Sequence, residues 1–383
     1  MAVAQGYGKT ITSGSVFAYD TGDSRNSYIG EPTTNLALFS VTSGITFNAD
    51  YAALTSQVAD YSVTYRGRPS LRCTSTGQWN IYKYPRSGNY TATSSTAFTF
   101  SWKMKWSDGR VPAFTNGYIY TDATYFYPAV TVTPLEDGWY LCQTTSSGTS
   151  SPVNLTGFTT TQYGTCYIAD WQVEAKSHAT SFTPAGTTRS ATQGLLPLVG
   201  NSTIDLSNVS FDSNAQLIWD GTDDTLAVSD TVTHKPNTSF TYEIVFKPLG
   251  GGTFYDKMLI GKLGWHTGIM YQYSTIWFRT RYGSPAFYDT SGYSVTQGNY
   301  YHAVATYTSN TSMKFYVNGT LIGENNSVTT PLFDIGDTLN IGGNSVNYSS
   351  YVEIPAVKTY NRALSAAEVK QNYLHYKTRF NLS

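Results

Sequence analysis

The sequence predicts an all-β fold of two antiparallel β-sandwiches, with an N-terminal arm and one short C-terminal helix. Composition is the first reason, because 32 of the 383 residues are tyrosine, aromatic residues reach 15% and charged residues only 13%. Half-buried strands favour aromatic side chains, whereas helices favour Ala, Glu, Lys and Leu. The second reason is length, since 383 residues exceed a typical single domain.

Residues 1–35 predict an N-terminal arm or docking segment, because Gly14, Gly22, Gly30 and Pro32 interrupt any periodic pattern. Residues 36–188 then predict the first sandwich. Within it, every second residue from Phe98 to Trp106 is apolar, which is the pattern of a half-buried strand.

The end of this first sandwich carries a recognisable pattern. Residues 138–142 read GWYLC, and residues 169–190 read ADWQVEAKSHATSFTPAGTTRS. The pattern resembles the closing part of the carbohydrate-binding-module-like jelly rolls found in phage virion proteins. The resemblance implies a jelly roll over residues 36–188, followed by a linker over residues 189–202.

Residues 203–383 predict a second sandwich. Strand patterns cover residues 216–226, 239–248, 301–307 and 313–322. In the last of these, Asn318-Gly319 separates two apolar runs, which predicts a hairpin with a type I′ turn. An apolar strand at 352–357 then leads into the C-terminal segment.

Residues 360–369 read YNRALSAAEV and predict the start of the helix. Ser365 is the expected N-cap, Glu368 completes a capping box, and Leu364 can pack against Val369. This run and the preceding strands resemble the laminin-G-like, concanavalin A-type domains of phage and bacterial surface proteins. The resemblance implies a lectin-like sandwich, a fold that has binding or structural roles more often than catalytic ones.

Several classes of function are disfavoured. The net charge of −1 has no basic cluster, which disfavours nucleic acid as a partner, and no apolar run is long enough to insert into a membrane. The N-terminus lacks the apolar stretch of a signal peptide, so we expect synthesis in the host cytoplasm. Three cysteines without CxxC spacing predict buried free thiols.

Catalysis finds no support in the spacing of the acidic residues. Glucanases on this fold carry Glu-x-Asp-x-x-Glu or a close variant, because a retaining mechanism needs two adjacent carboxylates. None of the seven glutamates lies in that pattern, and Asp170 and Glu174 share it only in part.

The five histidines are scattered, and we expect His302 to be a structural strand residue with a backbone or hydroxyl partner. The prediction is a non-enzymatic protein with no required cofactor.

Two sets of residues are candidate binding sites. Asp220, Asp223 and Asp224 cluster in one turn, where carboxylates either hold Ca²⁺ or simply form the turn. Aromatic side chains that can stack on sugars are a second set, although half of all strand residues face a core. The candidates are Trp265, His266, Tyr271, Tyr273, Tyr282 and Tyr288, with Trp79 and nearby tyrosines in the first sandwich.

The combined prediction is a structural protein on the surface of a bacteriophage virion, as a head decoration, fibre or tail adhesin that contacts host-surface polysaccharide. Its partners would be other virion proteins, such as capsid, portal-tail or fibre components, and further copies of itself in a homo-oligomer. Two alternatives stay open. One is a carbohydrate-active depolymerase, and the other is a purely structural virion protein without a glycan ligand.

Overall fold

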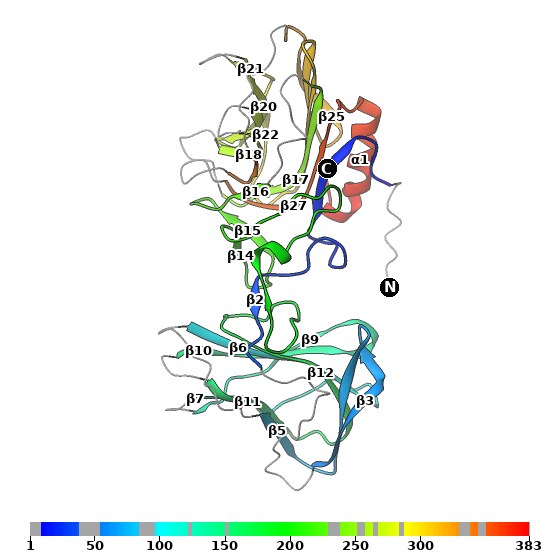
Figure 1. The fold of residues 1–383 in the computed structure, drawn as a ribbon, viewed down its shortest axis with the longest axis vertical. Helices are drawn as coiled ribbons and strands as arrows, with labels where there is room; N and C mark the ends of the chain where they lie inside the picture. The colour runs from blue at the N-terminus through cyan, green and yellow to red at the C-terminus, as the bar shows by residue number, and fades with distance from the viewer. Residues whose placement is uncertain are drawn as a thin grey trace. The chain divides into compact units, whose positions relative to one another are not determined.

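The computed structural model confirms the all-β prediction and divides the chain into two compact units. Each unit consists of antiparallel sheets, and the chain ends in one helix (Figure 1). The structure describes residues 9–37, 54–83, 96–121, 125–149, 153–228, 238–250, 257–262, 267–282, 287–328, 338–343 and 350–382. Within these residues, no helix has the length and apolar character needed to cross a membrane.

The second unit, called the inserted unit here, comprises Pro32–Ser190 with the short piece Ser213–Ala215, and it contains two larger sheets and a short ribbon. Its six-stranded sheet has the order β3 (Leu54–Tyr65), β4 (Arg68–Ser75), β12 (Gly164–Glu174), β6 (Thr96–Trp106), β10 (Tyr140–Thr149) and β9 (Thr131–Pro134). Its four-stranded sheet has the order β5 (Trp79–Lys83), β11 (Val153–Thr160), β7 (Asn116–Thr121) and β8 (Tyr125–Phe126). The ribbon pairs β2 (Thr33–Thr34) with β13 (Thr188–Arg189), and a 3-10 turn, η1 (Glu136–Gly138), precedes β10.

The core of the inserted unit forms around Trp102 on β6. The apolar residues that alternate along β6 are all buried, which confirms the predicted period of two. The Trp102 ring stacks on Phe100 and Phe158, with centroids 4.5 and 4.7 Å apart and interplanar angles of 19° and 9°. The two sheets therefore meet through aromatic rings, because Phe158 lies on β11 of the other sheet.

The C-terminal unit is a sandwich of an eight-stranded and a seven-stranded sheet. The first has the order β14 (Ser210–Phe211), β15 (Leu217–Asp220), β27 (Tyr351–Tyr360), β17 (Phe240–Pro248), β23 (Tyr301–Thr308), β24 (Ser312–Val317) and β25 (Thr320–Asn325), and β1 (Ser15–Asp20) also pairs with β27. The second has the order β16 (Leu226–Val228), β26 (Leu339–Ile341), β18 (Lys257–Lys262), β19 (Thr267–Gln272), β20 (Thr275–Arg281) and β21 (Phe287–Asp289), with β22 (Tyr293–Ser294) against β20.

The chain begins and ends in the C-terminal unit, which the sequence did not predict. We expected an arm over residues 1–35 and a linker over residues 189–202. Instead, residues up to Glu31 and the segment from Ala191 belong to the C-terminal unit. Strand β1 pairs along β27, and the amide of Ile29 donates to the carbonyl of Gly194. The unit formed by residues 32–190 is therefore an insertion between two neighbouring segments of the other.

The C-terminal helix, α1 (Ala366–Phe380), starts as the sequence predicts. The Ser365 side chain accepts from the backbone of Glu368, and the Glu368 carboxylate accepts from the backbone of Ser365, which completes the capping box. Leu364 and Val369 lie in one buried cluster. The helix ends at Asn381, whose positive φ of 49° forms a left-handed cap.

The predicted hairpin between β24 and β25 is also confirmed. Asn318 and Gly319 have φ angles of +49° and +72°, the left-handed conformation that both central positions of a type I′ turn require. The Asn318 side chain accepts from the backbone amide of His302, which ties this turn to β23.

A buried polar network lies between the eight-stranded sheet and α1. Glu243 on β17 is 1% exposed and accepts from Tyr360 and from Asn372 on the helix, at 3.0 and 2.7 Å. Its other oxygen lies 2.9 Å from Nε2 of His302 on β23. Asn372 also accepts from the backbone amide of Ile11, so the network joins the N-terminal segment to the helix. The expected backbone or hydroxyl partner of the His302 ring is thus replaced by a carboxylate.

The three cysteines are free and buried in the inserted unit. Cys73 and Cys166 occupy opposite positions on β4 and β12. Burial raises the pKa of the Cys166 thiol well above its usual value, so its thiolate is scarce at neutral pH.

Candidate functional site

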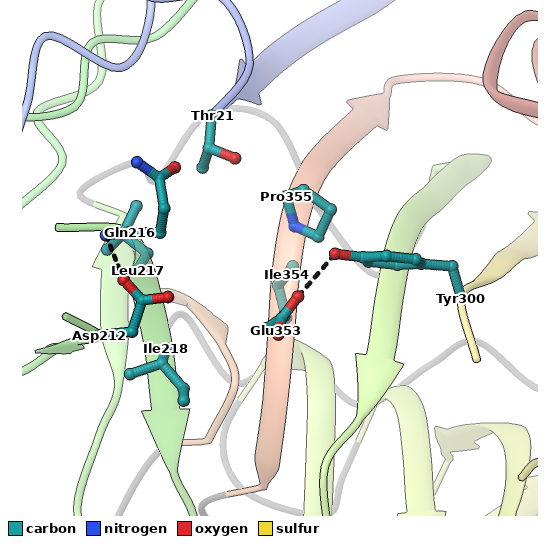
Figure 2. Close-up of a pocket in the computed structure, with 9 residues that line it drawn as sticks. All are labelled: Thr21, Asp212, Gln216, Leu217, Ile218, Tyr300, Glu353, Ile354 and Pro355. Carbon is teal, nitrogen blue, oxygen red and sulfur yellow. Dashed lines mark hydrogen bonds between the residues drawn. The ribbon is translucent and has the colours of Figure 1, made fainter. Parts of the chain in front are cut away.

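A solvent-accessible pocket lies on the C-terminal unit where β15, β27 and the start of β23 approach one another (Figure 2). Its volume is about 140 Å³. Asp212 and Gln216 line one side, and Glu353 and Tyr300 line the other (Figure 2). Thr21, Leu217, Ile218, Ile354 and Pro355 complete the wall. The pocket thus combines carboxylates, an amide and hydroxyls with an apolar surface.

Local hydrogen bonds hold the polar groups of this pocket in place. The Asp212 carboxylate accepts from the backbone amide of Gln216 at 2.9 Å, which fixes the turn between β14 and β15. The Tyr300 hydroxyl donates to Oε2 of Glu353 at 2.6 Å, and Lys247 pairs with Oε1 at 2.5 Å. Burial, followed by the Glu353 hydrogen bond, raises the pKa of Tyr300, so its hydroxyl stays a donor.

This arrangement suits a polyhydroxylated ligand. Carboxylates accept hydrogen bonds from hydroxyl groups, and an amide both donates and accepts. Apolar side chains such as Ile218 and Pro355 offer a surface for the C–H face of a sugar ring. Small-molecule sites characteristically combine an apolar wall with a few placed polar groups.

The aromatic residues predicted from the sequence do not form one site in the described residues. Tyr271 is 1% exposed and donates its hydroxyl to the carbonyl of Gly250, so its prediction as a sugar contact is wrong. Trp79 is likewise fully buried in the core of the inserted unit. Trp265 and His266 lie outside the described residues.

The remaining candidates in the C-terminal unit, Tyr273, Tyr282 and Tyr288, lie at the surface beside the seven-stranded sheet. Tyr273 is 59% exposed in the turn between β19 and β20. Tyr282 and Tyr288 are half-buried and stack on each other, with centroids 4.1 Å apart and an interplanar angle of 25°. Because each ring covers a face of the other, this pair offers less stacking surface than two separate rings.

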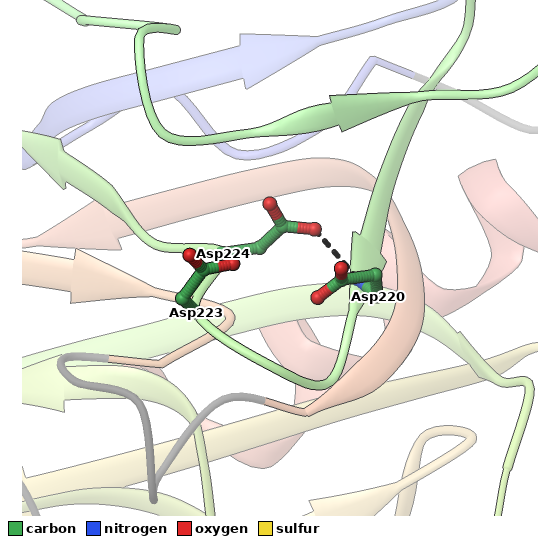
Figure 3. A group of neighbouring side chains, drawn as sticks. All are labelled: Asp220, Asp223 and Asp224. Atoms are coloured by element: carbon green, nitrogen blue, oxygen red, sulfur yellow. Dashed lines mark hydrogen bonds between the residues drawn. The ribbon is translucent and has the colours of Figure 1, made fainter.

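The three aspartates predicted as a calcium site do come together (Figure 3). Carboxylate oxygens of Asp220, Asp223 and Asp224 lie within 4.8 Å of one another. Asp224 is buried, accepts from the backbone amide of Asp220 at 2.6 Å and accepts from the Ser210 hydroxyl at 3.1 Å. Burial, and then the neighbouring aspartates, raise the pKa of Asp224, because ionisation brings a third negative charge into the turn.

These residues fit a calcium ion in part. Oxygens on opposite sides of Ca²⁺ are about 5 Å apart, since each lies 2.3–2.6 Å from the ion, and the observed separations meet that limit. A calcium ion takes about six to eight oxygens, so water or backbone carbonyls would supply the rest. The Lys257 ammonium donates to the carbonyl of Gly221 in this turn at 3.3 Å, and its positive charge opposes a bound cation.

Comparison with known proteins agrees with this fold. Residues 220–370 match the family model of the concanavalin A-like lectin/glucanases superfamily. These residues form a concanavalin A-like domain. A search of curated protein sequences found no match.

Solved structures are similar to part of the chain at low identity. The binding domain of Paraclostridial Mosquitocidal Protein 1 is 14% identical, with a TM-score of 0.41 over 47% of this chain and 49% of that one. The binding domain of botulinum neurotoxin serotype D is 12% identical, with a TM-score of 0.40 over 48% and 49%. The chain therefore spans about half the length of the structures that it matches.

The pocket beside the concanavalin A-like strands was not predicted from the sequence. Its residues come from four separate segments, around positions 21, 212–218, 300 and 353–355. These segments come together because β15 and β1 both pair with β27, and because β27 and β23 both pair with β17. Glu353 appeared in the sequence as one of seven scattered glutamates, and no local motif marked it.

Proposed function

We propose that the C-terminal unit is a non-enzymatic carbohydrate-binding module. The observation that carries this proposal is the pocket in Figure 2, where two carboxylates, an amide and two hydroxyl side chains surround an apolar wall. A sugar ring has the matching chemistry, with hydroxyls at its edge and C–H groups on its face. The lectin-like fold of residues 220–370 supports binding as the role.

We expect the Gln216→Ala variant to bind glycans about three- to tenfold more weakly than the wild-type chain, because it removes one or two hydrogen bonds at the pocket. Glycan-array screening identifies a ligand, and calorimetry then measures its affinity. Tyr273→Ala is the matched variant at the predicted aromatic surface. If Tyr273→Ala lowered the glycan affinity and Gln216→Ala left it unchanged, the sugar would bind at the seven-stranded sheet, and the pocket proposal would be contradicted.

We further propose that this module belongs to a bacteriophage virion protein, a head decoration, fibre or tail adhesin that contacts host-surface polysaccharide. The support is the two sequence patterns at residues 138–190 and 360–369, which resemble phage modules arranged in tandem. Other virion proteins and further copies of this chain are the proposed partners. Antibody labelling of phage particles tests the surface location, and unlabelled intact particles would contradict it.

A carbohydrate-active enzyme is the second candidate, and one observation favours it. Asp212 and Glu353 are two carboxylates that line the same pocket, and glycoside hydrolysis uses such a pair. However, both Glu353 oxygens already accept, from Lys247 and Tyr300, whereas a general acid must carry a proton. Reducing ends released from host polysaccharide by the wild-type chain but not by Glu353→Gln would establish the enzyme.

The aspartate turn is proposed to hold Ca²⁺. Calcium at 100 times its Kd should raise the free energy of unfolding by about 2.7 kcal/mol, seen as a higher Tm. Asp224→Asn should abolish this increase while keeping the hydrogen bond to the Asp220 amide. Without calcium, stability should fall as pH rises through the raised pKa of Asp224, because the folded state disfavours its ionisation. An equal calcium response in wild type and variant would exclude this site.

A further inference from the structure

We propose that Cys73 and Cys166 of the inserted unit form a cross-strand disulfide when the chain folds in the presence of a disulfide oxidant. The inference assigns a covalent modification site, and it is independent of the sugar binding proposed for the C-terminal unit. Both thiols are free in the structure, so the disulfide would be a second covalent state of the same fold.

The two cysteines lie directly opposite each other on neighbouring antiparallel strands. Cys73 on β4 and Cys166 on β12 are register partners, next to the partners Thr74 and Thr165. The Cα atoms of opposite residues in an antiparallel pair are about 4.5 or 5.5 Å apart, depending on the kind of pair. Disulfides span Cα separations of about 4.4–6.8 Å. The backbone therefore fits a disulfide for either kind of pair.

Both cysteine side chains point into the core of the inserted unit. Cys73 and Cys166 are each 0% exposed and belong to the cluster that contains Trp102. Side chains alternate along a strand, so Thr74 and Thr165 lie on the other face, where their hydroxyl oxygens are 3.3 Å apart. Burial and then hydrogen bonding with Cys73 raise the pKa of the Cys166 thiol, and the second effect requires the two side chains to be neighbours.

The third thiol, Cys142, lies too far away to compete. It is on β10, which β6 separates from β12. Two strand spacings are about 9.5 Å, whereas a disulfide does not bridge Cα atoms more than about 7 Å apart. Cys142 is also displaced along β6, because it pairs with Trp102 and Cys166 pairs with Trp106. The geometry thus predicts one specific cross-link and one remaining thiol.

The oxidant is a small disulfide such as oxidised glutathione. One cysteine thiolate attacks it, forms a mixed disulfide and releases one glutathione thiolate. The second cysteine thiolate then attacks the mixed disulfide and releases the other glutathione thiolate. Each cysteine loses a proton and each released glutathione gains one, so two protein thiols are oxidised and one glutathione disulfide is reduced. Because both sulfurs are buried, the exchange takes place while the inserted unit folds or opens.

The test refolds the full chain, first reduced and unfolded, in a buffer of oxidised and reduced glutathione. Alkylation in denaturant and mass spectrometry should count one free thiol in the wild type, against three after refolding with a reductant. Cys142→Ala should keep the cross-link and retain no free thiol, whereas Cys73→Ala and Cys166→Ala should each form no cross-link. Chymotrypsin, which can cut at Phe158 between Cys142 and Cys166, allows the linked peptides to be identified.

Stability gives a second measurement. The disulfide closes a long loop and restricts the unfolded chain, so oxidation should raise the folding equilibrium constant of the inserted unit by at least about tenfold. The rise should occur in the wild type and in Cys142→Ala but not in Cys73→Ala. Three free thiols in an oxidatively refolded chain with native near-ultraviolet circular dichroism, or a cross-link that includes Cys142, would overturn the proposal. A cross-link that lowers stability would overturn it as well, because the native register would not accommodate the bond.

Discussion

Replacing Glu243 with alanine is expected to lower the free energy of unfolding of the C-terminal unit by about 3–5 kcal/mol, because removing one partner of a buried charged network leaves the others unsatisfied. Tyr360, Asn372 and His302 would each lose their contact with the carboxylate. Chemical denaturation and calorimetry each measure this change in the free energy of unfolding. Glu324→Ala, a surface carboxylate 3.4 Å from Lys314, is the control and should cost less than about 1 kcal/mol.

The stability effect of Glu243→Ala is expected to depend on pH. Burial alone would raise the pKa of Glu243, but the His302 hydrogen bond and the positive charge of Lys358 bring it below its usual value. Its contribution to stability is therefore present above the unfolded pKa of about 4.3 and is lost as pH falls toward the folded pKa. The stability difference between wild type and Glu243→Ala should narrow on acidification. A difference that widens below pH 4 would contradict the assignment.

Replacing Trp102 with alanine is expected to destabilise the inserted unit by about 3–5 kcal/mol, since a large cavity forms where Phe100 and Phe158 now stack on the indole. Nε1 of Trp102 has no hydrogen-bond partner among the described residues, so the loss measures packing. Calorimetry should show the transition of the inserted unit moving to lower temperature while the other transition stays in place.

Two comparisons make the Trp102 prediction decisive. Trp102→Phe should retain part of the ring stacking and cost less than Trp102→Ala. Tyr61→Ala, at a strand position 71% exposed, should leave the transition within about 0.5 kcal/mol of wild type. If Trp102→Ala shifted both transitions equally, the two units would unfold as one, and their description as separate cores would be wrong.

Sequence alone predicted the features that depend on neighbouring residues. The capping box needs only Ser365 and Glu368, three positions apart, and the type I′ turn needs only Asn318-Gly319. The strand containing Trp102 was predicted because its alternation is continuous over nine residues. In each case the physical cause acts within one turn or one strand.

Features that depend on distant pairing were not predicted. Strand β1 is identified by its register with β27, more than 300 residues away, and its own flanks are rich in turn residues. Tyr271 could not be told from Tyr273 by composition, although one faces the core and the other faces solvent. The pocket at Tyr300 needs segments from four parts of the chain, so no window of sequence contains it.

The insertion has a consequence for cleavage and exchange of the inserted unit. The polypeptide enters the long segment Pro32–Ser190 of the inserted unit near Glu31 and leaves it near Ala191, and the segments beside these two crossings are hydrogen-bonded in the C-terminal unit. A protease that cuts one crossing leaves the two parts covalently attached, and release requires both cuts. Conversely, a short loop joining the two crossing points could replace the segment Pro32–Ser190 without altering the register of β1. A different module at this position would therefore leave the strand order of the C-terminal unit unchanged.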